Sequence, residues 1–264
     1  MQTQFRELTD SQCGSPPGQV IKAFLPVQGT KKHDLRVIMN AILWLVRTGV
    51  QWRHLESKYP PWQSVYYHFY RWSRNGTLEK INHALNKLVR LQAGRAALPS
   101  LMCVDSQSVK LSPFIAQHRG IDANKKINGR KRQAAVDTLG LLWAVKVHAA
   151  HQADCQVGCQ LWSQLLPVSE RLEKVLIDAS YQGSFTQIAD SMALVTEIAT
   201  RPETAQGFVP LKQRWVVERS FAWSMHSASN FFRRIVKDYE YTKESSQAML
   251  VLANTTIALN KMAT

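Results

Sequence analysis

Two aspartates in this 264-residue chain each follow a short run of apolar residues. The first is Asp105, in the sequence MCVDS, and the second is Asp178, in VLIDA. A buried strand delivers the residue that follows it to the carboxyl edge of a sheet, where ligands bind in open α/β folds. If the two strands are parallel neighbours, the two carboxylates meet and repel each other unless a cation lies between them. Hard oxygen ligands of this kind suit Mg²⁺.

A third acid, Glu218, lies among apolar residues in the stretch RWVVERSFAW. This stretch predicts a helix whose apolar face packs on the sheet and carries Glu218 to the same edge. Arg214 lies one turn before Glu218, where it can orient the carboxylate or hold a phosphate. Three carboxylates that hold two metal ions form a phosphoryl-transfer site, in which one ion activates the attacking oxygen and the other stabilises the leaving oxygen.

Each of these acids also has a structural interpretation. An aspartate commonly follows a strand because it starts a turn or caps a helix. Asp137 lies in a turn sequence, and Asp154, at the start of a predicted helix, suits helix capping. An Arg-Glu pair at i and i+4 is common on a solvated helix face. The combination of three acids in this order of elements, on a basic chain, favours a catalytic site.

The hydrophobic pattern predicts the elements that must hold these acids. Residues 1–32 are rich in Gly and Pro, and we expect a loosely ordered entry segment there. Apolar residues at helical spacing then predict helices in residues 35–49, 59–76 and 78–94, and core packing accounts for most of their Trp and Tyr residues. Three short helices of this kind resemble a small helix-turn-helix bundle.

The pattern changes after Pro99. Short apolar runs predict strands at 101–104, 174–177 and 192–198, a hairpin turns at Asp137–Gly140, and a helix covers 156–166. This order of strands and helices predicts an α/β fold with a mixed sheet and helices on its faces. The predicted domains are therefore a helical DNA-binding domain in residues 1–95 and a catalytic domain in residues 96–264.

The charge of the chain indicates its partner. With 33 basic and 19 acidic residues, the net charge of +14 favours a polyanion, through phosphate contacts and counterion release. We expect DNA-backbone contacts from six basic residues between positions 119 and 133, namely Arg119, Lys125, Lys126, Arg130, Lys131 and Arg132. Three more basic residues, Arg233, Arg234 and Lys237, suit either phosphate contacts or a solvated helix face. No apolar run reaches the length of a membrane span, so we expect no membrane partner.

Several of these segments together resemble DDE-type insertion-sequence transposases, in particular the insertion sequence five family with an IS4-like catalytic domain. The resemblance covers nearly the whole chain. Its segments are YPPWQSVYYHFYRW (59–72), VDSQSVK (104–110), NGRKRQAAVDTLGLLWAVKVHAA (128–150), LIDASYQG (176–183), RWVVERSFAW (214–223) and RRIVKDYE (233–240).

The resemblance implies an RNase H-like fold in which Asp105, Asp178 and Glu218 bind two Mg²⁺ ions, with Mn²⁺ as the alternative ion. It implies cleavage at the ends of a transposable element by water, followed by attack of the freed 3′-hydroxyl on target DNA. The implied partners are double-stranded DNA, as terminal inverted repeats and as target, and further copies of the chain in a homodimer or larger assembly. The implied location is the prokaryotic cytoplasm, at the nucleoid when bound to DNA.

The sequence departs from the family pattern at several positions near the acids. Gln133 replaces a His, Ala179 and Ser180 replace a Lys-Gly pair, Leu211 stands at a Tyr position and Met225 at a Lys position. Two alternatives therefore stay open beside an active transposase. One is a catalytically decayed copy that only binds DNA, and the other is a different RNase H-like nuclease, which cuts without strand transfer.

Overall fold

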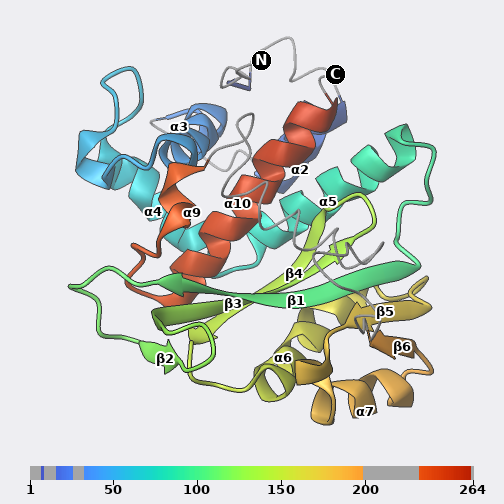
Figure 1. Cartoon of the computed structure of the whole chain (residues 1–264). Helices are drawn as coiled ribbons and strands as arrows, with labels where there is room; N and C mark the ends of the chain where they lie inside the picture. The colour runs from blue at the N-terminus through green and yellow to red at the C-terminus, as the bar shows by residue number, and fades with distance from the viewer. Residues whose placement is uncertain (1–6, 9–15, 26–32, 199–231, 263–264) are drawn as a thin grey trace, which may run out of the picture. The chain divides into compact units, whose positions relative to one another are not determined.

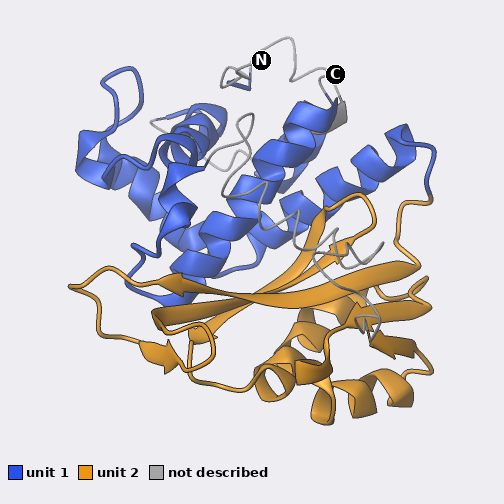
Figure 2. Cartoon of the chain, viewed as in Figure 1, with its two compact units in different colours: residues 1–95, 224–264 blue, residues 96–223 orange. Residues whose placement is uncertain are grey.

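The structure is a computed structural model and describes residues 7–8, 16–25, 33–198 and 232–262. The chain divides into two compact units, one formed by residues 1–95 together with 224–264 and the other by residues 96–223 (Figure 2). Each unit contains buried apolar side chains of its own.

The first unit contains the three helices that the sequence predicts. They are α3 (Leu35–Thr48), α4 (Trp62–Trp72) and α5 (Thr77–Gln92), with a short 3₁₀ helix, η1 (Trp52–His54), before α4. Helix α3 shows why the prediction succeeded at its ends. The side chain of Asp34 accepts a hydrogen bond from the Arg36 amide at 2.8 Å, and Gly49 ends the helix with a positive φ of 74°.

The entry segment differs from the prediction. Residues Pro16–Phe24, expected to be loosely ordered, form the helix α2, which packs against α5. Two prolines at the start of α2 are compatible with a helix, because the first turn has no intrahelical partner for the missing N–H groups. Ile21 and Leu25 are buried, so an apolar face of the segment gains its stability from packing on the other helices.

The described C-terminal residues belong to the first unit. Helices α9 (Arg233–Val236) and α10 (Lys243–Met262) pack with α3, and α10 also packs with α5. Between α10 and α5, the buried Asn254 side chain donates to the side-chain oxygens of Asn82 at 2.6 Å and Asn86 at 3.1 Å. The predicted domain of residues 96–264 and the second compact unit thus share the boundary at 95/96 and differ at the C-terminal end.

The second unit is built on a mixed sheet with helices, as predicted. Its strands are β1 (Leu101–Lys110), β2 (Gly120–Asp122), β3 (Ile127–Asp137), β4 (Leu142–Ala149), β5 (Lys174–Ile177) and β6 (Val195–Ile198). The strand order is β2-β3-β1-β5-β6, with β4 also paired to β3. The β1–β3 and β3–β4 pairs are antiparallel, whereas β1–β5 and β5–β6 are parallel.

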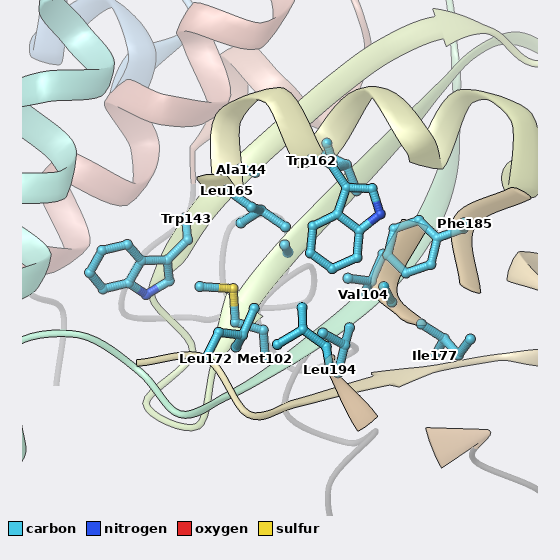
Figure 3. Close-up of a cluster of buried hydrophobic side chains, with 14 of the residues drawn as sticks. Met102, Val104, Trp143, Ala144, Trp162, Leu165, Leu172, Ile177, Phe185 and Leu194 are labelled. Atoms are coloured by element: carbon cyan, nitrogen blue, oxygen red, sulfur yellow. The ribbon is translucent and has the colours of Figure 1, made fainter. Parts of the chain in front are cut away.

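Two helices, α6 (Asp154–Leu165) and α7 (Ser184–Ser191), lie on the same side of the sheet (Figure 1). Their apolar side chains form the main core with Met102 and Val104 of β1. The rings of Trp162 and Phe185 stack there with centroids 5.0 Å apart (Figure 3). Cys103, Val136 and Leu176 form a smaller cluster, and alternation along their strands places this cluster on the opposite face of the sheet.

The hairpin prediction is confirmed and the predicted end of the first strand is wrong. The buried Asp137 carboxylate closes the turn between β3 and β4, since it accepts hydrogen bonds from the amides of Leu139 and Leu141 and from the Trp143 indole, at 2.9, 3.0 and 3.1 Å. Strand β1, however, continues past Asp105 to Lys110. Its second half is polar, and its pairing with β3 extends to the Lys110–Gly129 pair, a long-range contact that a local apolar pattern does not reveal.

Candidate active site

The parallel pairing of β1 with β5 brings the two predicted aspartates together. Leu101 pairs with Lys174 and Cys103 pairs with Leu176. Asp105 and Asp178 each follow the last of these pairs by two residues, so a continuation of the same register sets them opposite each other. Neighbouring strands of a sheet lie roughly 4.8 Å apart, a spacing at which two side chains on one face of the sheet can bind the same ion. The structure thus meets the condition on which the sequence argument for a shared site depended, namely that the two strands are parallel neighbours.

The two aspartates continue one face of the sheet. Side chains alternate between faces along a strand, so Asp105 follows Cys103, and Asp178, whose backbone stays extended, follows Leu176. That face is opposite to the one covered by α6 and α7. Both aspartates remain partly exposed, and water and ions therefore have access to them.

Asp178 also has a structural role. It caps the 3₁₀ helix η3 (Ala179–Tyr181), because its Oδ1 atom accepts a hydrogen bond from the Ser180 amide at 2.8 Å. The Ser180 hydroxyl donates to the same oxygen. Capping, the ordinary interpretation of an aspartate after a strand, thus holds for Asp178 and at the same time fixes the direction of its carboxylate. In β1, Asp105 Oδ1 accepts a hydrogen bond from the Ser106 amide at 2.7 Å.

A fully buried tyrosine lies close to three aspartates. Burial raises the pKa of the Tyr181 phenol, and the negative charges of Asp154, Asp105 and Asp178 raise it further, while Ser106 acts in the opposite direction. Tyr181 therefore remains a neutral phenol, which adds no further negative charge to a region already rich in carboxylates.

Asp154 joins the second aspartate to β3. Its Oδ2 lies 3.2 Å from Lys131 Nζ, and its Oδ1 accepts a hydrogen bond from Gln133 Nε2 at 3.2 Å. The Ser180 hydroxyl oxygen, which bonds Asp178, lies 3.4 Å from Asp154 Oδ2. The sequence suggested helix capping for Asp154, and its side chain binds these neighbours instead. Two positions that depart from the family pattern, Gln133 and Ser180, therefore contact the same carboxylate.

The six basic residues between positions 119 and 133 separate into two groups. Lys125 and Lys126 are exposed, and the Lys125 Nζ atom donates to the Ser106 carbonyl at 3.3 Å. Arg130 and Arg132 lie in β3 with 0% and 1% of their surface exposed, and Lys131 in the same strand is also buried. Arg119 is partly exposed, and its guanidinium donates to the Ser112 carbonyl at 2.7 Å.

Arg233, Arg234 and Lys237 separate in the same way. Arg233 is exposed and Lys237 is partly exposed, whereas Arg234 is buried. The Arg234 Nε atom donates to Glu240 Oε1 at 2.7 Å, so this guanidinium has a structural partner in the first unit.

The third predicted acid, Glu218, lies outside the described residues, as do Arg214 and the motif positions Leu211 and Met225. Among the residues that the structure describes, no group of three or more His, Cys, Asp and Glu side chains is arranged to hold a metal ion. Of the three predicted metal ligands, only Asp105 and Asp178 lie within the described residues. A pair of partly exposed carboxylates is a donor set that fits a hard divalent cation.

Comparison with known proteins identifies the family to which this chain belongs. Residues 96–254, more than half of the chain, match the family described as a transposase DDE domain, so the chain belongs to the DDE transposases. Residues 19–82 match a family described as a transposase of the IS4/5 family, in agreement with the resemblance seen in the sequence. The mixed sheet with its flanking helices is the RNase H-like fold of these enzymes.

One curated protein is similar to part of this chain. It is the uncharacterized protein y4sN of Sinorhizobium fredii (strain NBRC 101917 / NGR234), which is 29% identical over 121 residues, 44% of this chain and 86% of the relative. The family itself defines an enzyme that binds DNA and works with divalent metal ions. In the described part of the chain, no helix has the length and apolar character needed to cross a membrane.

Proposed function

We propose that this transposase cuts DNA at the ends of its element and joins the freed 3′ ends to target DNA, with Asp105, Asp178 and Glu218 as the ligands of two Mg²⁺ ions. The observation that supports the proposal is the parallel pairing of β1 with β5, because Asp105 and Asp178 each follow the Cys103–Leu176 pair by two residues. When bound, such ions activate the attacking oxygen and stabilise the leaving oxygen.

The residues around the pair favour oxygen ligands over sulfur. Cys103 lies two residues before Asp105 and is buried. Burial, together with the charges of Asp137 and Asp105, raises the pKa of the Cys103 thiol to about 12. The thiol therefore stays protonated at neutral pH, and a protonated thiol is a poor metal ligand. This environment supports a hard cation such as Mg²⁺, with Mn²⁺ as a substitute.

The proposal includes the DNA partners and the assembly. We expect terminal inverted repeats and target DNA to bind through the accessible basic residues Lys125, Lys126, Arg233 and Lys237, and Arg214 to support Glu218 or hold a phosphate. Two element ends must be cut and joined together, which favours at least a dimer of the chain on paired ends. Such a reaction takes place where the genome is, at the nucleoid of a prokaryotic cell.

The test is a cleavage and strand-transfer assay on DNA that carries the ends of the element, with and without Mg²⁺. The variants are Asp105→Asn and Asp178→Asn, and the matched control is Asp190→Asn, an exposed acid on α7. We expect metal-dependent 3′-hydroxyl ends and joined products from the wild type and the control, and neither from the first two variants. Tight binding without cutting by the wild type would establish a decayed copy, and cutting without joining would establish a different nuclease.

A further inference from the structure

The outer face of α4 carries three exposed tyrosines. Helical periodicity separates this helix into a buried face with Val65, Phe69 and Trp72 and an outer face of polar and aromatic residues. On the outer face, Tyr66, Tyr67 and Tyr70 have 39%, 54% and 44% of their surface exposed. Core packing, which the sequence suggested for most aromatic residues of this region, does not account for these three rings.

Two of the tyrosines are paired with arginines one helical turn later. The Arg71 guanidinium lies 5.6 Å from the centre of the Tyr67 ring, and its Nη1 atom donates to the Tyr67 hydroxyl at 3.2 Å. The Arg74 guanidinium lies 4.3 Å from the centre of the Tyr70 ring. Contacts of this kind order the two arginine side chains before any ligand binds, and less conformational entropy is then lost on binding.

The third tyrosine, Tyr66, lies between Tyr70 and the 3₁₀ helix η1. Tyr66 packs edge-on against Trp52 of η1 with ring centroids 5.2 Å apart, and its ring lies 6.4 Å from that of Tyr70. The rings of Tyr66 and Tyr70 are therefore packed against other side chains of the first unit and do not stand alone in solvent.

The charge of this face is uniform. The sequence of α4, WQSVYYHFYRW, and the four residues after it contain no acid, and they contribute Arg71 and Arg74 to a chain with a net charge of +14. Ordered guanidiniums beside exposed aromatic rings match the two parts of a nucleotide, since arginines bind phosphates and aromatic rings stack on bases.

We propose that the outer face of α4 binds an unpaired DNA strand, with bases stacked on Tyr67 and Tyr70 and phosphates held by Arg71 and Arg74. In a duplex the faces of the bases are covered by their neighbours, so exposed tyrosines gain stacking contacts only from unpaired bases. The inference rests on the proposed function in one respect, namely that cutting at an element end is the source of the unpaired strand.

The test compares binding of the full chain to one labelled oligonucleotide as a single strand and as a duplex, by fluorescence anisotropy. Tyr67→Leu and Tyr70→Leu are expected to weaken single-strand binding about 5- to 150-fold each and to change duplex binding much less. Arg71→Gln and Arg74→Gln should each lower the slope of log Kobs against log salt concentration by about 0.7 on the single strand. Tyr241→Leu, at an exposed tyrosine elsewhere in the same unit, is the control and should bind as the wild type does.

Two results would overturn the inference. Equal losses on single strand and duplex would mean that the face contacts phosphates only, and unchanged binding with a changed oligomeric state in light scattering would mean that it contacts a second copy of the chain. Binding to an oligonucleotide requires no cleavage, so the same binding assay is also run on the Asp105→Asn variant, which we expect not to cut DNA. Its result therefore does not depend on the proposed function. If the chain cuts no DNA and yet Tyr67→Leu loses single-strand binding, the proposed function fails and this inference stands.

Discussion

The substitution Gly158→Ala tests whether helix α6 fixes the position of Asp178 through the Tyr181 ring. A Cβ atom at this position would lie 2.8 and 2.9 Å from two ring carbons of Tyr181 and 3.2 Å from Gln133 Oε1. Tyr181 is fully buried and packs edge-on against Phe185, with ring centroids 5.4 Å apart. The ring has no room to turn away, so Gly158→Ala must displace either α6 or the short helix η3.

The expected loss of stability is small, because two effects oppose each other. Alanine favours the helix over glycine by about 1 kcal/mol. Overpacking of a filled core costs about 1–3 kcal/mol. The net loss is thus about 1 kcal/mol, which lowers the melting temperature by roughly 2–4 °C.

The expected loss of activity is larger. Tyr181 follows Asp178 by three residues within the same capped turn, so a displaced ring moves the Asp178 carboxylate. A misplacement of about 1 Å in a catalytic group can lower a rate by roughly 100-fold. We therefore expect the Gly158→Ala protein to fold and to cut element ends about 10- to 100-fold more slowly than the wild type.

The assay combines thermal unfolding with single-turnover cleavage. Gln160→Ala, on the exposed side of the same helix, is the matched control, since it raises helix propensity without a contact to Tyr181. A Gly158→Ala protein that melts higher than the wild type and cuts at the same rate would refute the reasoning, because the contact with Tyr181 would then be loose.

Three further predictions concern the stability of the two units. Asp137→Ala removes the buried acceptor of three hydrogen bonds and should lower the unfolding free energy by about 3–5 kcal/mol in urea titrations; a loss below about 1 kcal/mol would contradict the role of this carboxylate. Burial lowers the pKa of His148, so the unfolded chain binds its proton at a higher pH than the folded chain. The free energy of unfolding therefore does not depend on the protonation of His148 above about pH 6.5, and it falls as the pH is lowered below that value, by at most about 1.4 kcal/mol per pH unit. The His148→Gln variant should show a weaker dependence of unfolding free energy on pH. Asn254→Ala should destabilise the pairing of α10 with α5 by about 1–3 kcal/mol, measured as a lower melting temperature, and an unchanged melt would mean that its buried hydrogen bonds contribute nothing net.

Local signals in the sequence predicted those features that depend on neighbouring residues. Asp34 and Gly49 mark the ends of α3, and Asp137 marks the hairpin turn, because capping and turn geometry need only a few adjacent residues. The apolar runs before Asp105 and Asp178 also predicted two strands, whereas the parallel pairing of these strands was only a condition of the argument and is shown by the structure.

Features that depend on distant parts of the chain were not predicted. The continuation of β1 past Asp105 depends on β3, and helix α2 depends on its packing against α5. The burial of Arg130 is likewise a consequence of strand pairing, since its charge alone suggested an exposed position. The contacts of Asp154 with Gln133 and Ser180 join three separate segments, and only the folded sheet brings these segments together.

The first unit is built from two separate segments of the chain, and this affects how it folds during synthesis. Its two parts, residues 1–95 and 224–264, are separated in the chain by the whole second unit. A ribosome that adds roughly 5–20 residues per second needs about 6–26 s to produce the intervening segment. During that time the buried faces of α3 and α5 have no α10 to cover them, whereas the second unit can already fold. We therefore expect nascent chains stopped before α10 to associate with chaperones through their N-terminal helices, and the release of α10 to be the step that completes the first unit.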